Sequence, residues 1–179
     1  MYRRCYDRGM APIIRSSNGW PIISTRAECR DWLIPGTQIE IPLRPGNAGF
    51  VLTHFITNFH RTVEPLNLGA KGDDHGWAPR PIAGTNIPSN HWSATAIDLN
   101  SIKHPYGIRG TFTRLKKLAR LQWMLKFKYK GMIAWGGNWR TVTDEMHFEI
   151  VATQDEIRML AQELRKTQVG REIMRVNAM

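Results

Sequence analysis

Residues 89–100 read SNHWSATAIDLN and join a strand pattern to two side chains that can bind a metal ion. The apolar stretch within 95–99 is short and is bounded by polar residues, so it predicts a β-strand. Asp98 lies at the end of this strand, where a site can open, and His91 precedes it by seven residues. Because imidazole and carboxylate groups both bind Zn²⁺, the segment contains two candidate ligands.

Residues 143–150, TDEMHFEI, predict a second strand that carries another histidine. If this strand begins at His147, then His147 and Glu149 project from one face and Phe148 from the other, because side chains alternate along a strand. Glu149 could orient a neighbouring ligand through a hydrogen bond, although a solvated position fits the alternation equally well.

Pairing of the two strands would bring Asp98 next to His147, although the sequence does not prove that pairing. With His91, they would form a set of two imidazoles and one carboxylate. Hydrolytic zinc enzymes use three protein ligands and keep one coordination position for water. They also need a base that does not bind the metal, and Asp144 is the candidate because it lies three residues before His147.

Each of these features also has an ordinary structural explanation. A histidine beside a tryptophan, as His91 is beside Trp92, is more often a packing residue than a ligand. An aspartate at a strand end usually forms a turn, and an alternating His-Phe-Glu segment is usually a half-exposed strand. The metal site is therefore favoured by the combination of features and by no single one of them.

The remaining patterns predict an α+β fold. We expect strands at 38–43, 95–99, 131–135 and 146–151, and helices at 49–66, at 111–127 and from 153 onward. Regular βαβ alternation is absent from this order, which favours a small, largely antiparallel sheet with packed helices.

Apolar spacing assigns the inward face of each helix. The first helix is expected to pack one face on the core, with Asn47 as its cap. The buried stripe of the 111–127 helix is expected to consist of Leu115, Leu118, Leu121 and Leu125. Residues 153–156, TQDE, form a capping-box sequence. They open a third helix whose inward residues are Ile157, Leu160, Ala161 and Leu164.

The chain has 179 residues, a formal net charge of +10 and 42% hydrophobic residues. This length predicts one domain, in which 1–46 is an N-terminal extension, 47–167 the core and 168–179 a tail. The surplus positive charge indicates attraction to nucleic acid, an anionic membrane or an anionic cell-wall polymer, and composition does not choose among them.

The sequence also excludes several classes of protein. Cys5 and Cys29 are too few for a disulfide scaffold. No stretch approaches the ~18–20 apolar residues of a membrane span. The first residues lack the apolar core of a signal peptide, so we expect a protein made in a cytoplasm without its own export signal.

Three segments occur in the order found in a known family. SNHWSATAIDLN resembles the SxHxxGxAxD motif of the zinc D-alanyl-D-alanine peptidases and related peptidoglycan endopeptidases (the M15 family). Residues 135–150, WGGNWRTVTDEMHFEI, resemble that family's second signature. Residues 76–81, GWAPRP, are similar to its GYRP element. The resemblance covers about residues 49–165 and extends to phage endolysins.

The resemblance implies a catalytic zinc ion and a fold shared with Hedgehog signalling domains. It implies that His91, Asp98 and His147 bind Zn²⁺, and that Asp144 takes the place of the family's acidic general base.

Other residues are implied to contact substrate. Arg80 matches an arginine that binds substrate and stabilises the oxyanion, and Ser89 matches the motif serine. Trp139 is a candidate wall of a substrate groove, together with Trp77, Trp92 and Trp135, although core packing is an alternative for all four tryptophans.

The chain departs from the family pattern at three positions. Ala94 replaces a glycine, and an alanine would be strained there if the position requires a positive φ. Met146 stands where many relatives have proline or tryptophan, and Asn138 stands where an acidic residue is common. These departures affect the expected substrate contacts more than the zinc site.

We therefore expect a zinc peptidase that hydrolyses the stem peptide of bacterial peptidoglycan, as a phage endolysin of the L-alanyl-D-glutamate endopeptidase type. The alternatives are a D-alanyl-D-alanine carboxypeptidase, a non-catalytic Hedgehog-like zinc-binding module and a basic nucleic-acid-binding protein. The last leaves the His/Asp set unexplained and lacks a recognised motif. We expect a monomer without nucleic acid that uses its charge to bind anionic wall polymers. It would lie in the host cytoplasm until a holin-type pore releases it.

The acidic loop at 71–76 offers two other ways to bind a metal ion, a calcium site of its own or a fourth ligand for the zinc. Its carboxylates could bind calcium, but the spacing lacks that of a known calcium loop. His75 as a fourth zinc ligand would close the position that catalysis needs.

Overall fold

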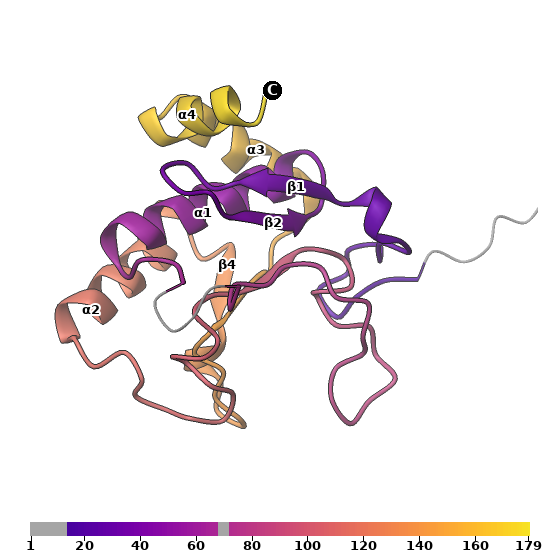
Figure 1. Cartoon of the computed structure of the whole chain (residues 1–179). Coiled ribbons are helices and arrows are strands. Elements are labelled where there is room, and N and C mark those ends of the chain that lie inside the picture. Colours follow the sequence, from indigo (N-terminus) through magenta and orange to yellow (C-terminus); the bar gives the residue numbers. More distant parts are fainter. Residues whose placement is uncertain (1–13, 68–71) are drawn as a thin grey trace, which may run out of the picture.

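The computed structural model describes residues 14–67 and 72–179 and has an α+β architecture (Figure 1). The first four elements are η1 (Arg26–Glu28), β1 (Arg30–Leu33), β2 (Glu40–Leu43) and α1 (Asn47–Thr62). Loops join α1 to β3. The elements after them are β3 (Ala96–Asp98), α2 (Leu115–Trp123), the π-helical turn η2 (Met124–Lys128), β4 (Ile133–Trp135), η3 (Gly136–Asn138), β5 (His147–Ile150), α3 (Gln154–Arg165) and α4 (Gln168–Val176). This confirms the fold class expected from the sequence.

Helix α1 lies at the centre of the molecule and is covered on several sides (Figure 1). The strand β1 and the helices α3 and α4 all contact it, and twelve consecutive residues, 48–59, are buried. The expectation that α1 packs only one face on the core was therefore wrong. A helix that is buried on nearly all sides lies inside its domain, and buried polar residues of α1 such as Thr53 and Asn58 donate hydrogen bonds to carbonyl groups of the helix itself.

The first turn of α1 also differs from the expectation. Gly46 is the N-cap, with a φ of 79°, and no side chain caps the helix. Asn47 lies inside the first turn, and its Oδ1 accepts a hydrogen bond of 2.8 Å from Arg165 Nη2. Asn47 thus fastens α1 to α3, because its side chain points to a neighbouring helix and away from its own backbone.

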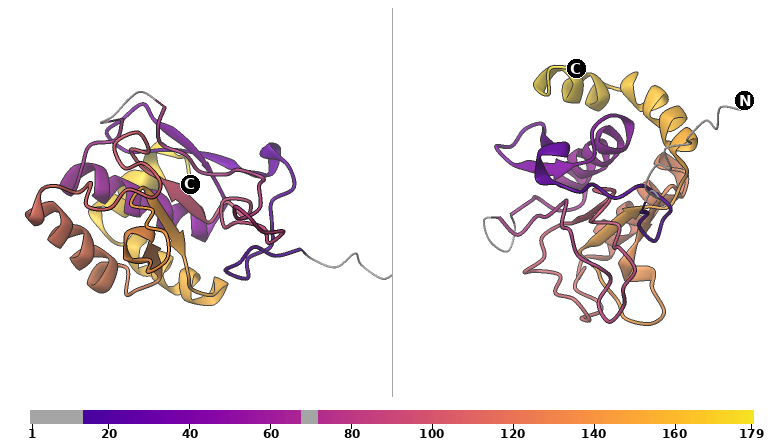
Figure 2. Two further views of the ribbon diagram at one scale, coloured as in Figure 1. Left: turned by 90° about the horizontal axis from the view of Figure 1, so that it is seen from below. Right: turned by 90° about the vertical axis from the view of Figure 1, so that its right-hand side faces the viewer.

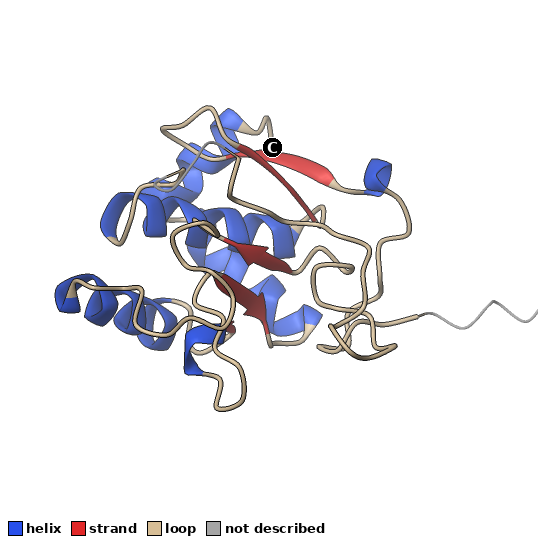
Figure 3. Ribbon diagram, turned by 60° about the horizontal axis from the view of Figure 1, so that its bottom comes forward, coloured by secondary structure: helices blue, strands red, loops and turns tan. Residues whose placement is uncertain are grey.

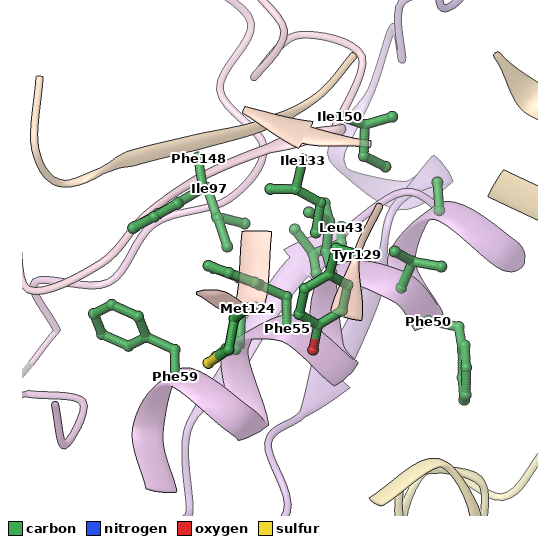
Figure 4. Packing of buried hydrophobic residues seen from close by; sticks show 14 of the residues in the cluster. Leu43, Phe50, Phe55, Phe59, Ile97, Met124, Tyr129, Ile133, Phe148 and Ile150 are labelled. Atoms are coloured by element: carbon green, nitrogen blue, oxygen red, sulfur yellow. The ribbon is translucent and has the colours of Figure 1, made fainter. Parts of the chain in front are cut away.

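The three-stranded sheet has the order β3-β5-β4, and both pairings are antiparallel. The register places Asp98 opposite His147, which confirms the strand pairing that the sequence left open. Phe148 projects from the face toward α1, and its ring centroid lies 4.9 Å from Phe55 and 5.6 Å from Phe59 (Figure 4). The other face carries His147 and Glu149.

The N-terminal region contains more structure than its sequence predicted. The expected strand at 38–43 is β2, but it pairs with β1, which the sequence analysis missed. Trp20 and Trp32 join the same hydrophobic cluster as α1 and the sheet. The described part of the 1–46 extension is therefore packed into the core.

Helix α2 begins later than predicted and changes its winding. It starts at Leu115, four residues after Thr111, and continues after Trp123 as a π-helical turn. Leu121 and Leu125 are buried, as expected, but Leu115 is 80% exposed. The assignment of Leu115 to the buried stripe was wrong, because the first turn of α2 extends past the core and gives this residue nothing to pack against.

The last two helices arch over α1 (Figure 2). The capping box at Thr153 and Glu156 is formed, and the four predicted inward residues of α3 are all buried. The 168–179 tail contains a separate helix, α4, whose N-cap Thr167 accepts a hydrogen bond from the Gly170 amide. Within the described ranges, no helix has both the length and the apolar character needed to cross a membrane.

Candidate metal centre

Three predicted ligands meet at one point on the outer face of the sheet. His147 Nδ1 lies 3.0 Å from Asp98 Oδ1 and 3.1 Å from His91 Nε2, and the last two atoms are 3.3 Å apart. All three residues are buried. Ligand atoms around a tetrahedral zinc ion with bonds of about 2.0–2.1 Å lie roughly 3.3 Å from one another. The donor set and its spacing therefore fit a zinc ion.

Backbone geometry places these three side chains. Asp98 and His147 are cross-strand partners in β3 and β5. His91 lies in the turn before β3, where the Ala94 amide donates a hydrogen bond of 2.9 Å to the His91 carbonyl. Ala94 has a φ of 55°, so position 94 does require the left-handed conformation that glycine adopts most easily. This tight turn folds His91 back over the end of the strand.

The second nitrogen of each imidazole faces an acceptor. His91 Nδ1 lies 2.6 Å from the Gly76 carbonyl oxygen, and His147 Nε2 lies 3.0 Å from Glu149 Oε2. Each of these nitrogens must carry the proton, which leaves the other nitrogen with a lone pair that points into the cluster. Two lone pairs and a carboxylate oxygen then face one another, an arrangement that is unfavourable unless a cation or a proton lies between them.

The protonation equilibria of the metal-free site reflect this convergence. Burial alone would lower the pKa of His147, but hydrogen bonds to Asp98 and Glu149 raise it to about 9. Burial alone would raise the pKa of Asp98, but hydrogen bonds from His147 and His91 hold it well below its usual range. These shifts favour a protonated His147 in the metal-free site, so metal binding has to displace that proton.

Glu149 is itself held by a chain of hydrogen bonds. Asn90 Nδ2 donates to Glu149 Oε2 at 2.7 Å, and Asn90 Oδ1 accepts from Ser17 Oγ at 2.8 Å and from the Asn18 amide at 3.0 Å. The N-terminal extension thereby fixes Asn90, which fixes Glu149, which orients His147. Sequence reasoning missed Asn90, and its only signal was its position next to His91.

Asp144 lies in the turn between η3 and β5. Its amide donates to the Gly136 carbonyl at 3.1 Å, and its own carbonyl accepts from the His147 amide at 3.2 Å. The side chain is 7% exposed, and Oδ1 has no hydrogen-bond partner among the described residues. Burial raises the pKa of Asp144 to about 6, with a smaller opposing effect from His147. An unpartnered carboxylate beside the cluster is suited to accept a proton.

All seven predicted site residues line one cleft of about 530 Å³. Arg80 is 66% exposed, and its Nη2 lies 4.0 Å from Asp98 Oδ2. Among the described residues that line the cleft, Arg80 is the only arginine or lysine. Sequence reasoning missed Tyr106 and Ile82, which also line the cleft and lie in loops without a distinctive pattern. Figure 3 shows how much of the chain around the sheet is loop.

Ser89 and Trp139 contribute in different ways. Ser89 Oγ donates a hydrogen bond of 2.7 Å to the Arg80 carbonyl, so it positions the arginine's backbone. The Trp139 ring lies 5.2 Å from the His147 ring and forms part of the cleft wall. The other tryptophans adjoining the motifs do not line the cleft: Trp135 is buried in the core, and Trp77 Nε1 donates to the Ile23 carbonyl.

The acidic loop at 71–76 does not form a second metal cluster in its described part, which begins at residue 72. The two carboxylate oxygens of Asp74 accept hydrogen bonds from the Asn100 and Asn67 amides. His75 pairs with Asp98 through backbone atoms only, and it is exposed. Within 14–67 and 72–179, His91, Asp98 and His147 form the only group with the spacing of metal ligands.

Comparison with known proteins supports part of the family resemblance. Residues 83–150 match a protein-family model described as D-alanyl-D-alanine carboxypeptidase. This range contains the three candidate ligands and Asp144 but not Arg80. No curated protein and no solved structure matches the chain.

Proposed function

We propose that this protein is a zinc peptidase that hydrolyses an amide bond in the stem peptide of bacterial peptidoglycan. The observation that carries the proposal is the convergence of His91 Nε2, Asp98 Oδ1 and His147 Nδ1 beside the unpartnered carboxylate of Asp144. The family match at 83–150 supports the same class of reaction.

The residues around the cluster have separate tasks in this mechanism. A zinc ion held by His91, Asp98 and His147 would acidify water and polarise the scissile carbonyl. Asp144 accepts the proton of the attacking water and returns it to the leaving amine. Arg80, at the exposed edge of the cleft, stabilises the negative charge that develops on the carbonyl oxygen.

The substitution Asp144→Asn tests this assignment. Peptidoglycan hydrolysis should fall by roughly 10²–10⁴-fold, since the general base is removed while the metal ligands remain. Zinc content, measured by elemental analysis, should be unchanged. Asp155→Asn, at an exposed carboxylate in the first turn of α3, is the matched control and should retain full activity. Undiminished hydrolysis by the Asp144→Asn protein would refute the role.

The bond that is cut divides the proposal into two branches. We favour the L-alanyl-D-glutamate endopeptidase type, on the resemblance to endolysins. The alternative is a D-alanyl-D-alanine carboxypeptidase, which the description of the matched family favours. Mass spectrometry of digested peptidoglycan separates them, because one releases a new amino group on D-glutamate and the other releases free D-alanine.

The biological setting is part of the proposal. An endolysin of this type would act as a monomer and would wait in the host cytoplasm until a holin-type pore gave it access to the wall. A non-catalytic zinc module of Hedgehog type would not need the buried base Asp144. Wall hydrolysis that stops with a chelator and returns with zinc distinguishes the enzyme from that module.

A further inference from the structure

The segment 114–130 is strongly basic and lies at the periphery of the molecule, where Figure 1 shows α2. It contains seven arginines and lysines and no acidic residue. These are Arg114, Lys116, Lys117, Arg120, Lys126, Lys128 and Lys130. None of its residues lines the catalytic cleft.

One face of this segment packs on the core, and the opposite face exposes large apolar side chains. Leu121, Met124 and Leu125 are buried. Trp123 is 46% exposed and Phe127 is 59% exposed, and Leu115 at the start of α2 is 80% exposed. Residues at i, i+3, i+4 and i+7 share one side of a helix, so Lys116 and Arg120 flank Trp123.

The exposed aromatic rings and the cations form a single surface, which we call the α2 face: Leu115, Lys116, Arg120, Trp123, Lys126 and Phe127. The centroids of Trp123 and Phe127 lie 6.0 Å apart. The Arg120 guanidinium lies 4.9 Å from the Trp123 ring, and Lys126 Nζ lies 5.2 Å from the Phe127 ring. An apolar centre is thus rimmed by positive charge.

We propose that the α2 face binds the surface of an anionic phospholipid bilayer. The cations would contact lipid phosphates while Trp123, Phe127 and Leu115 enter the boundary between headgroups and acyl chains. Tryptophan suits that boundary because its ring is apolar and its N–H is polar. A hydrophilic polyanion would satisfy the cations equally well, but it would gain nothing from the exposed aromatic and leucine side chains. The combination therefore favours a bilayer as the occupant.

Binding to vesicles tests the proposal with the full-length protein. Wild-type protein should co-sediment with phosphatidylcholine vesicles that contain roughly 30% phosphatidylglycerol and should not co-sediment with pure phosphatidylcholine. The substitutions Trp123→Ala/Phe127→Ala should weaken partitioning by on the order of tenfold, because they remove the inserted rings. Lys116→Gln/Arg120→Gln should weaken it by at least about tenfold, because each lost cation weakens attraction to the anionic surface.

Matched variants control for general effects. Val151→Ala/Met159→Ala removes exposed apolar groups elsewhere, and Lys166→Gln/Arg175→Gln removes two exposed charges near the C-terminus, one between α3 and α4 and one on α4. Both should change partitioning by less than about twofold, because bilayer contact is confined to one face within a Debye length of about 10 Å. Thermal melts verify that each variant is folded, and the Asp144→Asn protein should still bind vesicles.

Two results would overturn the proposal. One is unchanged vesicle binding in both α2 variants. The other is tight binding of the wild type to soluble poly(glycerol phosphate) without any partitioning to anionic vesicles, which would assign the α2 face to a polymer. Neither result depends on whether the cleft hydrolyses peptidoglycan.

Discussion

Asp144 has a buried carboxylate and lies in the same cleft as the three candidate metal ligands. Its pKa is about 6 against an ordinary value of 3.8, chiefly because burial disfavours the charged form. The folded metal-free protein therefore binds this proton more tightly than the unfolded chain does. Protonated Asp144 contributes its full stabilising free energy below its ordinary pKa of 3.8. This contribution is lost as the pH rises through about 6.

This linkage predicts that Asp144→Asn stabilises the metal-free protein above pH 6. The gain should be on the order of 1–2 kcal/mol, since two pKa units correspond to about 3 kcal/mol and solvent in the cleft screens part of it. Urea unfolding in the presence of a chelator measures it, with pH 4 as the internal control, where the difference between the proteins should shrink. A variant that is no more stable than the wild type at pH 8 would show that the Asp144 carboxylate is solvated in the folded protein.

Asn90 offers a second test at the level of single residues. Asn90→Asp keeps the shape of the side chain but replaces the N–H that Glu149 accepts with an oxygen, so two carboxylates would face each other. Glu149 would lose its orientation, and His147 would be less well held for metal binding. We expect zinc affinity to fall about 10–100-fold, as it does when partners of metal ligands are removed.

Competition with a chromogenic chelator measures the zinc affinity of the Asn90→Asp protein. Asn138→Asp is a suitable control, because it adds a charge of the same kind at an exposed site outside the cleft lining. An affinity equal to that of the wild type would show that Glu149 holds His147 without help from Asn90.

The sequence predicted that the three candidate ligands would lie together, because residue types and strand alternation carry that information. His147 and Glu149 must share a face once a strand begins at His147, and Asp98 must end the preceding strand. By contrast, the role of Asn90 depends on residues 17 and 18, which reach it from a distant part of the chain. Ala94 was predictable only in part. The motif indicated that an alanine would be strained if this position requires a positive φ, and the structure shows that its φ is 55°.

At the scale of elements, the short turn η3 controls where Asp144 lies. A Cβ added to Gly136 would meet the Asp144 carbonyl oxygen at 2.4 Å and the Asp144 Cβ at 3.1 Å. Real contacts of this kind do not occur, so backbone atoms would have to move. Gly136 is therefore a positioning residue for the proposed base, although it does not line the cleft itself.

We expect Gly136→Ala to reduce kcat by at least about tenfold, because a shift near 1 Å at a reacting group is costly. Metal content should stay unchanged, which separates a displaced base from a lost ligand. Gly131→Asn is the matched control: this glycine has a φ of 74°, an added Cβ would meet nothing within 4 Å, and asparagine tolerates that conformation. An unchanged kcat in the Gly136→Ala protein would mean that the backbone of η3 shifts to accommodate the methyl group while Asp144 keeps its position.

Helix α2 shows why element boundaries were harder to predict than element types. The leucine spacing predicted a helix correctly, but it assumed one constant winding from 111 to 127. The π-helical turn at 124–128 changes the phase, and the exposed Leu115 shows that apolar spacing alone does not reveal what packs against it. Such information is tertiary, because it depends on how far the core extends beneath the helix.

At the scale of the whole molecule, the two faces of the three-stranded sheet differ: one packs on the hydrophobic core and the other borders the cleft. Helix α1 covers one face of the β3-β5-β4 sheet with aromatic contacts, and loops surround the other face, which carries the candidate metal centre (Figure 3). The sheet therefore supports polar side chains, Asp98, His147 and Glu149, that line the cleft. Alternation along β5 alone sends Phe148 to the core and His147 to the cleft.

The net charge of +10 supplies the last test at this scale. If the charge concentrates the enzyme on anionic wall polymers, raising the salt concentration should slow hydrolysis of intact wall particles several-fold, because the Debye length falls from about 30 Å at 0.01 M to about 10 Å at 0.1 M. Hydrolysis of a soluble, uncharged stem-peptide substrate should hardly change, since the chemistry within the cleft does not depend on long-range attraction.

The triple substitution Arg158→Gln/Lys166→Gln/Arg175→Gln provides the complementary variant. Arg158 lies on α3, Arg175 lies on α4, and Lys166 lies between the two helices as the C-cap of α3. All three are outside both the cleft and the α2 face, so their loss lowers the net charge without changing either surface. Wall binding by this protein should be weaker at low salt and should converge with that of the wild type at high salt. Equal salt sensitivity on walls and on the soluble peptide would instead place the effect of salt inside the cleft, where Arg80 is the exposed cation.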